Sequence, residues 1–137
     1  MLAGSLLAMP KAGAIEIVIK GLRSDKGFVG ASLFSSENAS AFPGGADKAV
    51  ATRYVKIENR DEVRLVLEDI PHGTYSVSVI HDEDGDGKVG MLLGIPKEGF
   101  GFSNNPTIFF GPPAFKKASF DFASDKAVAE IKMKYLL

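Results

Sequence analysis

Apolar and polar residues alternate along most of this chain, and this period of two restricts its fold more than any other feature. Ile15, Ile17 and Ile19 fall on one side of the first alternating segment. Successive side chains of a β-strand point to opposite faces, so this spacing is typical of a strand with one buried face. We expect strands over residues 15–20, 28–34, 52–58, 63–68, 75–79, 120–122 and 129–135.

Turn signals separate these segments and help to predict the architecture. Gly21, Gly27 and the polar residues between them follow the first segment, so we expect the first two strands to form a hairpin. About seven short strands without an amphipathic helix favour an all-β fold, namely an antiparallel β-sandwich with Greek-key connections. A small closed barrel is the alternative.

The length of 137 residues fits one domain with its own core, and we place this domain at residues 15–137. Residues 1–14 are largely small and apolar and end in Ala12-Gly13-Ala14, a pattern typical of a signal-peptidase site. We expect the remnant of an export signal there, with a disordered N-terminal arm as the alternative. An export signal would place the protein in the periplasm or outside the cell. No other apolar run is long enough for a membrane helix, so we expect no transmembrane segment.

Charge and residue usage exclude several classes of function. The formal net charge is −1 and the basic residues are scattered, so we expect no nucleic-acid partner. The chain contains no cysteine, which excludes a disulfide scaffold, a thiolate zinc site and a cysteine nucleophile. The two histidines lie far apart, which does not favour a zinc site.

The stretch from Asp82 to Pro113 lacks the alternating pattern and is rich in glycine. A connection of about thirty residues without structure is unusual inside a compact domain, so we expect it to hold further structure or to carry function. Each glycine adds to the entropic cost of ordering the segment. We expect packing among apolar side chains of the loop, or a bound ion, to compensate.

Three acidic residues at the start of this loop have the spacing of a calcium-binding loop. Asp82, Asp84 and Asp86 alternate, and a glycine that permits a sharp turn follows them. Calcium takes about six to eight oxygen ligands, and alternating carboxylates on a tight loop can converge on one point. The carbonyl oxygen of Lys88 would lie at the seventh position of such a loop and offer a further ligand. Calcium is the one cofactor that these residues suggest.

The match to an EF-hand is incomplete. Its twelfth position, which carries a bidentate Glu in an EF-hand, is Leu93, and we expect no flanking helices. A calcium site of another type, with Glu83 or Glu98 completing the ligand shell, is the alternative to an ordered turn without a metal. We favour the metal-free turn, because Asp and Gly also dominate turns in which side chains bond their own backbone.

His81 ends a predicted strand beside Asp82, which suggests acid–base chemistry. With Asp82 or Glu98 as its partner, His81 would serve a hydrolase. The chain lacks the G-x-S-x-G signature of a nucleophile elbow, although Ser103 is a candidate nucleophile. We favour another role for a lone histidine at the end of a strand, that of a hydrogen-bonded structural residue.

The second half of the loop combines aromatic and polar side chains. Its phenylalanines predict either an exposed patch for a partner or a sugar, or a satellite hydrophobic cluster beneath the loop. They are Phe100, Phe102, Phe109, Phe110 and Phe115. The residues that we expect to bind a ligand or partner are His81, Phe100, Phe102, Ser103, Asn104 and Asn105.

The acidic stretch belongs to a longer pattern. The pattern comprises residues 81–88 (HDEDGDGK), 94–105 (GIPKEGFGFSNN) and 110–115 (FGPPAF), and residues 70–77 (IPHGTYSV) precede it. On these residues the chain resembles the bacterial domain-of-unknown-function family numbered 2141, over nearly all of its length after Ala14. The resemblance implies a small exported protein, and its Pro-x-Gly-x-Tyr-x-Val turn is similar to that of transthyretin-like and immunoglobulin-like modules. It implies no activity.

Three functions remain open at this point. The first is a non-catalytic binding module with a calcium-stabilised loop, whose partner would be a glycan, a peptide or an envelope protein. The second is a hydrolase that uses His81 with Asp82 or Glu98. The third is a purely structural envelope protein in which the loop is a rigid plug. We favour the first, because the chain contains no recognisable nucleophile or complete metal triad.

Overall fold

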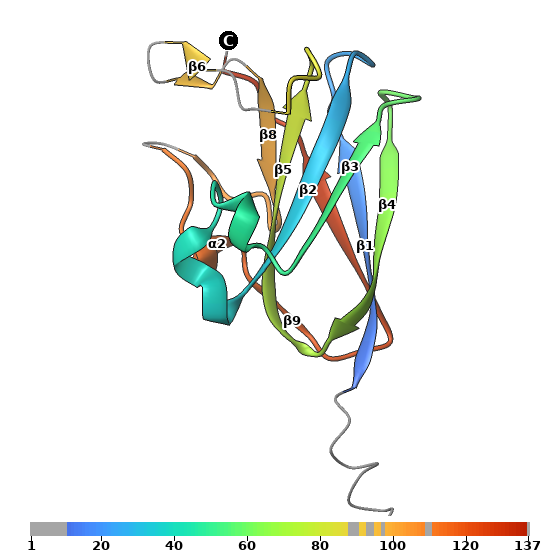
Figure 1. Cartoon of the computed structure of the whole chain (residues 1–137), viewed down its shortest axis with the longest axis vertical. Helices are drawn as coiled ribbons and strands as arrows, with labels where there is room; N and C mark the ends of the chain where they lie inside the picture. Colours follow the sequence, from blue (N-terminus) through green and yellow to red (C-terminus); the bar gives the residue numbers. More distant parts are fainter. Residues whose placement is uncertain (1–10, 88–90, 93–94, 97, 109–110, 137) are drawn as a thin grey trace, which may run out of the picture.

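The computed structural model describes residues 11–87, 91–92, 95–96, 98–108 and 111–136, and the main strands form two facing β-sheets (Figure 1). The three-stranded sheet has the order β10 (Lys126–Lys132), β1 (Ala12–Lys20) and β4 (Val63–Pro71). The five-stranded sheet has the order β3 (Ala51–Lys56), β2 (Phe28–Ser35), β5 (Gly73–Asp82) and β8 (Gly99–Phe102), and β9 (Phe120–Phe122) also pairs with β5. The predicted all-β sandwich is therefore confirmed.

Several short elements complete the described part of the chain. They are the 3₁₀ helices η1 (Ser36–Ala41) and η2 (Ala46–Lys48), the helix α2 (Phe115–Ala118) and a separate pair of strands, β6 (Met91–Leu92) and β7 (Ile95–Pro96). The helical segments η1 and α2 lie on the outer side of the five-stranded sheet (Figure 1). Among the described residues, no helix has the length and apolar character needed to cross a membrane.

The predicted hairpin between the first two strands is wrong. β1 pairs antiparallel with β4 and parallel with β10, whereas β2 pairs with β3 and β5 in the other sheet. The turn between Lys20 and Phe28 thus carries the chain from one sheet to the other. A glycine-containing turn suits either connection, so the turn residues alone do not distinguish them. Because β1 and β10 are parallel, the three-stranded sheet is mixed rather than purely antiparallel.

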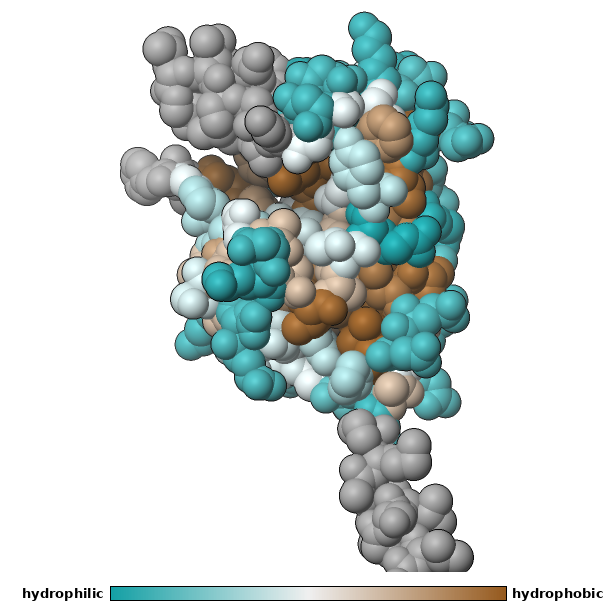
Figure 2. All heavy atoms as spheres, in the orientation of Figure 1, coloured by the Kyte–Doolittle hydropathy of each residue, from teal (hydrophilic) through white to brown (hydrophobic). Residues whose placement is uncertain are grey.

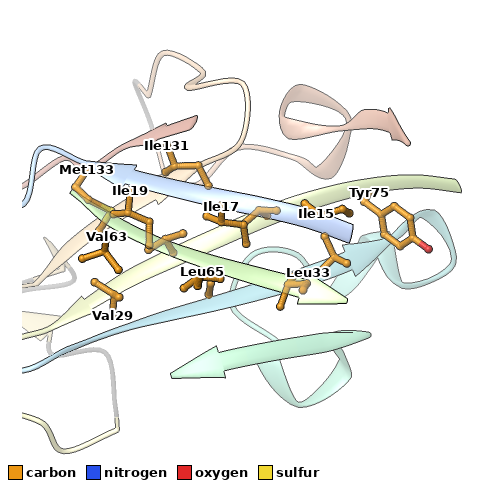
Figure 3. Packing of buried hydrophobic residues seen from close by; sticks show 14 of the residues in the cluster. Ile15, Ile17, Ile19, Val29, Leu33, Val63, Leu65, Tyr75, Ile131 and Met133 are labelled. Carbon is orange, nitrogen blue, oxygen red and sulfur yellow. The ribbon is translucent and has the colours of Figure 1, made fainter. Parts of the chain in front are cut away.

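The core lies between the two sheets and consists of the alternating apolar residues. Ile15, Ile17 and Ile19 of β1 are fully buried, and they belong to one cluster with Leu33 of β2 and Leu65 of β4 (Figure 3). Burying one such side chain completely contributes about 1.5–3 kcal/mol. The β-branched side chains of the three isoleucines also favour the extended backbone, so packing and local preference agree along β1.

A second hydrophobic cluster covers part of the outer face of the five-stranded sheet. Phe34 of β2 and Phe102 of β8 are buried there with Ala118 of α2 and Phe42. The Phe42 ring packs edge-on against the rings of Phe34 and Phe102, with centroid separations of 5.5 and 5.8 Å. This cluster attaches η1 and α2 to the sheet.

The loop phenylalanines that the structure describes belong to this satellite cluster. Phe102 is buried in it, and Phe100 and Phe115 pack against it partly buried. Their placement favours the satellite cluster over an exposed aromatic patch. The remaining two, Phe109 and Phe110, lie outside the described residues.

The segment predicted as one long loop, residues 82–113, contains regular structure. β8 adds to the main sheet beside β5, and β6 pairs with β7. At Gly99 a Cβ would overlap the Tyr135 ring, and at Gly101 it would lie 2.6 Å from a methyl carbon of Ile131. Because glycine occupies these close approaches, β8 has no apolar inward residues and the alternating pattern does not reveal it.

The first strand begins earlier than predicted. β1 starts at Ala12, and the backbone N–H of Ala14 donates to the Asp125 carbonyl over 2.9 Å. The last residues of the segment predicted as a signal remnant or a disordered arm therefore belong to the sheet. Residues 1–10 lie outside the described residues.

Candidate functional site

Four acidic side chains meet at one end of the sandwich, and we call Asp82, Asp84, Asp86 and Glu98 the acidic cluster. One carboxylate oxygen of each residue lies within 4.8 Å of the others. Asp82 ends β5 and Glu98 directly precedes β8, and these two strands are neighbours in the sheet. Strand pairing therefore brings together acids that are distant in the sequence. Asp82 and Glu98 are buried, whereas Asp84 and Asp86 are exposed.

The Asp82 carboxylate accepts hydrogen bonds from the turn that follows it. Its Oδ1 accepts from the Gly85 N–H at 3.1 Å, and its Oδ2 accepts from the Gly87 N–H at 2.8 Å. The Tyr54 hydroxyl also donates to Oδ2. Burial raises the pKa of Asp82, but the bonds from Tyr54 and Gly87 and those with neighbouring carboxyls outweigh it, so the net pKa is lowered. These donors favour the ionised form.

Asp84 and Asp86 lie on the exposed side of the same turn. The Asp86 N–H donates to Asp84 Oδ1 over 3.2 Å, which is an Asx turn. This bond lowers the pKa of Asp84, but the hydrogen bond with Asp82 and the charge of Asp86 act against it, and the net pKa is raised. Like charges around one point disfavour the ionised form, and a cation at that point would have the opposite effect.

Glu83 points away from the acidic cluster and anchors its loop. Its carboxylate accepts hydrogen bonds from the Arg23 guanidinium at 2.5 Å and from Ser24 Oγ at 2.9 Å. The bond from Arg23 holds the pKa of Glu83 below its usual value. The backbone N–H of Glu83 donates to Glu98 Oε2 at 2.7 Å. Of the two acids expected to complete the ligand shell, Glu98 thus lies in the cluster and Glu83 does not.

The turn between β1 and β2 packs directly against the acidic loop. Gly27 has a φ of 75° and approaches the end of β5 so closely that a Cβ would overlap the carbonyl oxygens of Asp82 and Glu83. Only glycine accepts both this φ and this approach without strain. Gly27 therefore helps to set the position of the acidic loop.

His81 is fully buried beside the acidic cluster, and both of its ring nitrogens have partners. Nε2 lies 2.8 Å from the Lys26 carbonyl oxygen, and Nδ1 lies 2.6 Å from the Tyr135 hydroxyl. Because a carbonyl only accepts, we infer that Nε2 carries a proton and donates to Lys26. The Tyr135 oxygen accepts from the Arg23 N–H at 3.2 Å. These bonds hold the His81 ring in place.

Ser103 connects β5 to α2 from a fully buried position. Its hydroxyl donates to the Ala118 carbonyl at 2.5 Å and accepts from the Val77 N–H at 2.9 Å. The Ser103 side chain is thus both donor and acceptor for backbone groups that have little access to water.

The two asparagines after Ser103 also bond to the backbone. Asn104 and Asn105 have φ values of 65° and 45°, a region that Asn tolerates better than most residues. The Asn104 side-chain amide donates to the Ser119 carbonyl at 2.7 Å. The Asn105 amide donates to the Glu130 carbonyl at 3.0 Å and accepts from the Lys132 N–H at 2.8 Å. Asn105 therefore pairs with the edge of β10 much as a neighbouring strand would.

The residues predicted to bind a ligand or partner lie in one region but do not share an open surface. Their side chains are buried or half-buried at His81, Phe100, Phe102 and Ser103. The side chains of Asn104 and Asn105 bond to the backbone, as described above. A role in binding stays a prediction for all six.

Comparison with known families agrees with the motifs of this region. The model of a bacterial family described as "Uncharacterized protein conserved in bacteria (DUF2141)" matches residues 17–130, which contain the whole acidic cluster. The chain belongs to this family. No curated protein and no solved structure matches it. The immunoglobulin-like or transthyretin-like character stays a prediction, and the function of this DUF2141 member has to be argued from its geometry.

A groove next to the acidic cluster is the part of the site that sequence reasoning missed. It encloses about 380 Å³ on the outer face of the five-stranded sheet, between η2 and the acidic loop. Its lining includes Tyr54, Asp82 and Gly87. Tyr54 is 49% exposed, whereas Val55 packs against the core. The alternation along this strand could have indicated it. Val55 and Ile57 point inward, so Tyr54 lies on the outer face, which the groove occupies.

Proposed function

We propose that this DUF2141 protein is an exported, non-catalytic binding module whose acidic cluster binds a calcium ion. The observation that carries this proposal is the convergence of four carboxylate oxygens within 4.8 Å of one another. Three of the acids lie on the turn after β5 and the fourth precedes β8, so a bound ion would join the acidic loop to the sheet. In this proposal the ion stabilises the loop, and the loop borders the binding surface.

The donor set suits calcium better than a transition metal. All four groups offer oxygen, and calcium takes about six to eight oxygen ligands at about 2.3–2.6 Å. Zinc and copper prefer nitrogen and sulfur ligands, but the chain has no cysteine and both nitrogens of His81 are hydrogen-bonded. The Lys88 carbonyl, which we expected among the ligands, lies outside the described residues.

Hydrogen-bond donors from the turn and from β3 orient the Asp82 carboxylate. The N–H groups of Gly85 and Gly87 and the Tyr54 hydroxyl all donate to it. Four carboxylates around one point also repel one another, and a divalent cation would reverse this repulsion. The turn therefore combines backbone donors that orient Asp82 with a charge density that favours a cation.

The hydrolase alternative receives less support. His81 is fully buried, and its ring nitrogens bond to Lys26 and Tyr135. The Ser103 hydroxyl bonds to the backbone at Val77 and Ala118. Neither side chain has the access that a general base or a nucleophile needs. The purely structural role is supported by the bonds of Ser103 and the two asparagines, and a calcium titration distinguishes it from our proposal.

Isothermal titration calorimetry of the protein with calcium chloride tests the proposal. We expect one site with a Kd of about 10⁻⁴–10⁻³ M, the range of extracellular calcium modules. Asp84→Asn and Asp86→Asn remove charge from exposed positions of the turn, so both should weaken binding without unfolding the protein. Glu68→Gln is the matched control, because Glu68 is an exposed acid on β4 outside the cluster.

The outcomes separate the three functions. Weaker calcium binding in both aspartate variants, with unchanged binding in Glu68→Gln, would support the proposal. The absence of heat and of any thermal shift at millimolar calcium would contradict it and favour the purely structural role. Equal weakening in the control would show that calcium binds through general surface charge rather than in the acidic cluster.

A further inference from the structure

The groove beside the acidic cluster has the size and the lining of a site for a small ligand. Its volume of about 380 Å³ falls within the range of about 300–1,000 Å³ that is typical of such sites. Outward-facing residues of three strands line it, namely Gly30 and Ser32 on β2, Thr52 on β3 and Ile80 on β5. Figure 2 looks onto this face, where pale and apolar residues line a hollow between the helical segments and the upper end of the molecule.

Tyr54 presents a fixed aromatic ring along this groove. Its ring stacks on Phe28, with centroids 4.7 Å apart and an interplanar angle of 12°. It lies over Gly30, where a Cβ would come within 3.4 Å of the Tyr54 ring. The hydroxyl donates to Asp82, so both ends of the side chain are held. A held and half-exposed ring is a good packing surface for an apolar face of a ligand.

The groove also offers hydrogen-bonding groups to a ligand. The hydroxyls of Ser32 and Thr52 form no hydrogen bond with the described residues. Asp47 of η2 is exposed and adds a carboxylate, and Asp82 adds another beside the acidic loop. A ligand in the groove would therefore meet hydroxyls and carboxylates on its polar side and the Tyr54 ring on its apolar side.

We propose that the groove binds a neutral hexopyranose unit of a carbohydrate and that the calcium ion holds this unit at one end. The inference rests on the proposed function, which supplies the ion. An apolar C–H face of the sugar packs on the Tyr54 ring, and its hydroxyls bond to Ser32, Thr52 and Asp47. Two vicinal hydroxyls replace water among the oxygen ligands of the calcium.

Other classes of ligand match the lining less well. The Asp47 carboxylate repels an anionic ligand, and the cationic residue among the described lining, Arg53, already donates to the Val66 carbonyl at 3.0 Å. An apolar ligand would cover the hydroxyls and carboxylates without replacing their hydrogen bonds with water. A basic side chain would pair with the carboxylates, and the experiment below includes that case.

Tyr54 links the sugar site to the ion. The residue that packs against the ligand donates to Asp82, which is itself a member of the acidic cluster. An ion that orders Asp82 therefore also orders the ring, and a ligand that packs on the ring favours the ion-bound arrangement. By this reciprocity, calcium and sugar should each strengthen the binding of the other.

Saturation-transfer difference NMR on the whole protein tests this inference. The probes are methyl α-mannopyranoside, methyl β-glucopyranoside and methyl β-galactopyranoside, each measured in calcium and again after EDTA. We expect transfer to ring C–H protons of at least one probe in calcium and its loss in EDTA. Tyr54→Ala should weaken binding about tenfold, because it removes the stacking surface. Val128→Ala is the matched control, because Val128 is 60% exposed on the other sheet.

Calorimetry with calcium alone separates the failure of this inference from that of the proposed function. Calcium binding without transfer to any probe would overturn the carbohydrate assignment and leave the ion site standing. Undiminished transfer to a sugar in Tyr54→Ala would overturn the assignment to this groove. Binding of a peptide with an unmodified lysine side chain that competes with the sugars, or replaces them, would overturn it in favour of a basic ligand. Absence of calcium binding would overturn both proposals.

Discussion

The hydroxyl of Tyr54 on the edge strand β3 donates a hydrogen bond to the carboxylate of Asp82 at the end of β5. β2 lies between these two strands, and the bond passes over its outer face, where Gly30 leaves space for the ring. The groove and the acidic cluster are therefore joined through two side chains. A change in either residue should be measurable at both places.

Tyr54→Phe keeps the aromatic ring but removes the donor to Asp82. We expect a loss of about 1 kcal/mol of stability, below the value for a buried charged bond because Tyr54 is half-exposed. Calcium affinity should fall about threefold, because Asp82 loses one of the groups that orient it. Urea denaturation and calorimetry measure the two effects. Tighter calcium binding in this variant would contradict the role that we assign to the bond.

Two buried serines, Ser76 on β5 and Ser103 directly after β8, should respond differently to substitution by alanine. Ser103→Ala leaves the Val77 N–H and the Ala118 carbonyl without their partner, so we expect a loss of about 2–3 kcal/mol. Ser76→Ala is the matched control, because the buried Ser76 hydroxyl has no hydrogen bond in the described structure. That variant should be neutral or slightly more stable. Equal losses in the two variants, measured by urea denaturation, would argue against the bridging role of Ser103.

Two glycines allow a similar comparison for the position of the acidic loop. Gly27→Ala forces a Cβ against the Asp82 carbonyl at a φ of 75°, and we expect a loss of about 3 kcal/mol together with weaker calcium binding. A Cβ at Gly44 meets no atom within 4 Å, so Gly44→Ala should leave both properties unchanged. Thermal unfolding with and without calcium gives both readings. Normal calcium binding in a folded Gly27→Ala protein would show that the loop does not depend on this contact.

Because three tyrosines have raised pKa values, we expect the protein to lose stability at high pH. The hydrogen bond with Asp82 raises the pKa of Tyr54 to about 12, and burial raises the pKa of Tyr75 and Tyr135. Phenols of an unfolded chain titrate near ~10. Because the folded values are higher, the protonated phenols stabilise the fold fully below pH ~10, and this contribution is lost as the pH rises through the folded values.

Phenolate absorbance of the folded protein and of the protein in guanidinium tests this pH dependence. The folded protein should titrate at higher pH than the unfolded chain, and alkaline unfolding should accompany the last phenol. Superimposable titration curves would contradict the hydrogen bond and the burial from which the raised values follow.

The strands with alternating residues were the predictable part of the fold. Ile15, Ile17 and Ile19 are all buried. Their burial was predictable because the period of two is visible within the strand itself. β8 was missed because Gly99 and Gly101 occupy its inward positions, where Tyr135 and Ile131 fill the space instead. The local pattern also could not predict which strands pair, since the same turn residues can close a hairpin or connect two sheets.

At the site, the acidic residues were easier to predict than the contacts that their side chains make. The spacing of Asp82, Asp84 and Asp86 indicated their convergence, and Glu98 joins them through the pairing of β5 with β8. Tyr54 comes from a strand that no motif connects with the acids. The side chains of Ser103, Asn104 and Asn105 bond to backbone groups. Every residue has such groups, so the sequence does not show which of them these side chains contact.

A crystal structure of the protein grown with calcium tests the central claim most directly. We predict an anomalous density peak between Asp82, Asp84, Asp86 and Glu98, at about 2.3–2.6 Å from their carboxylate oxygens. A water molecule or a lysine ammonium at that position, with no anomalous signal at saturating calcium, would contradict the account.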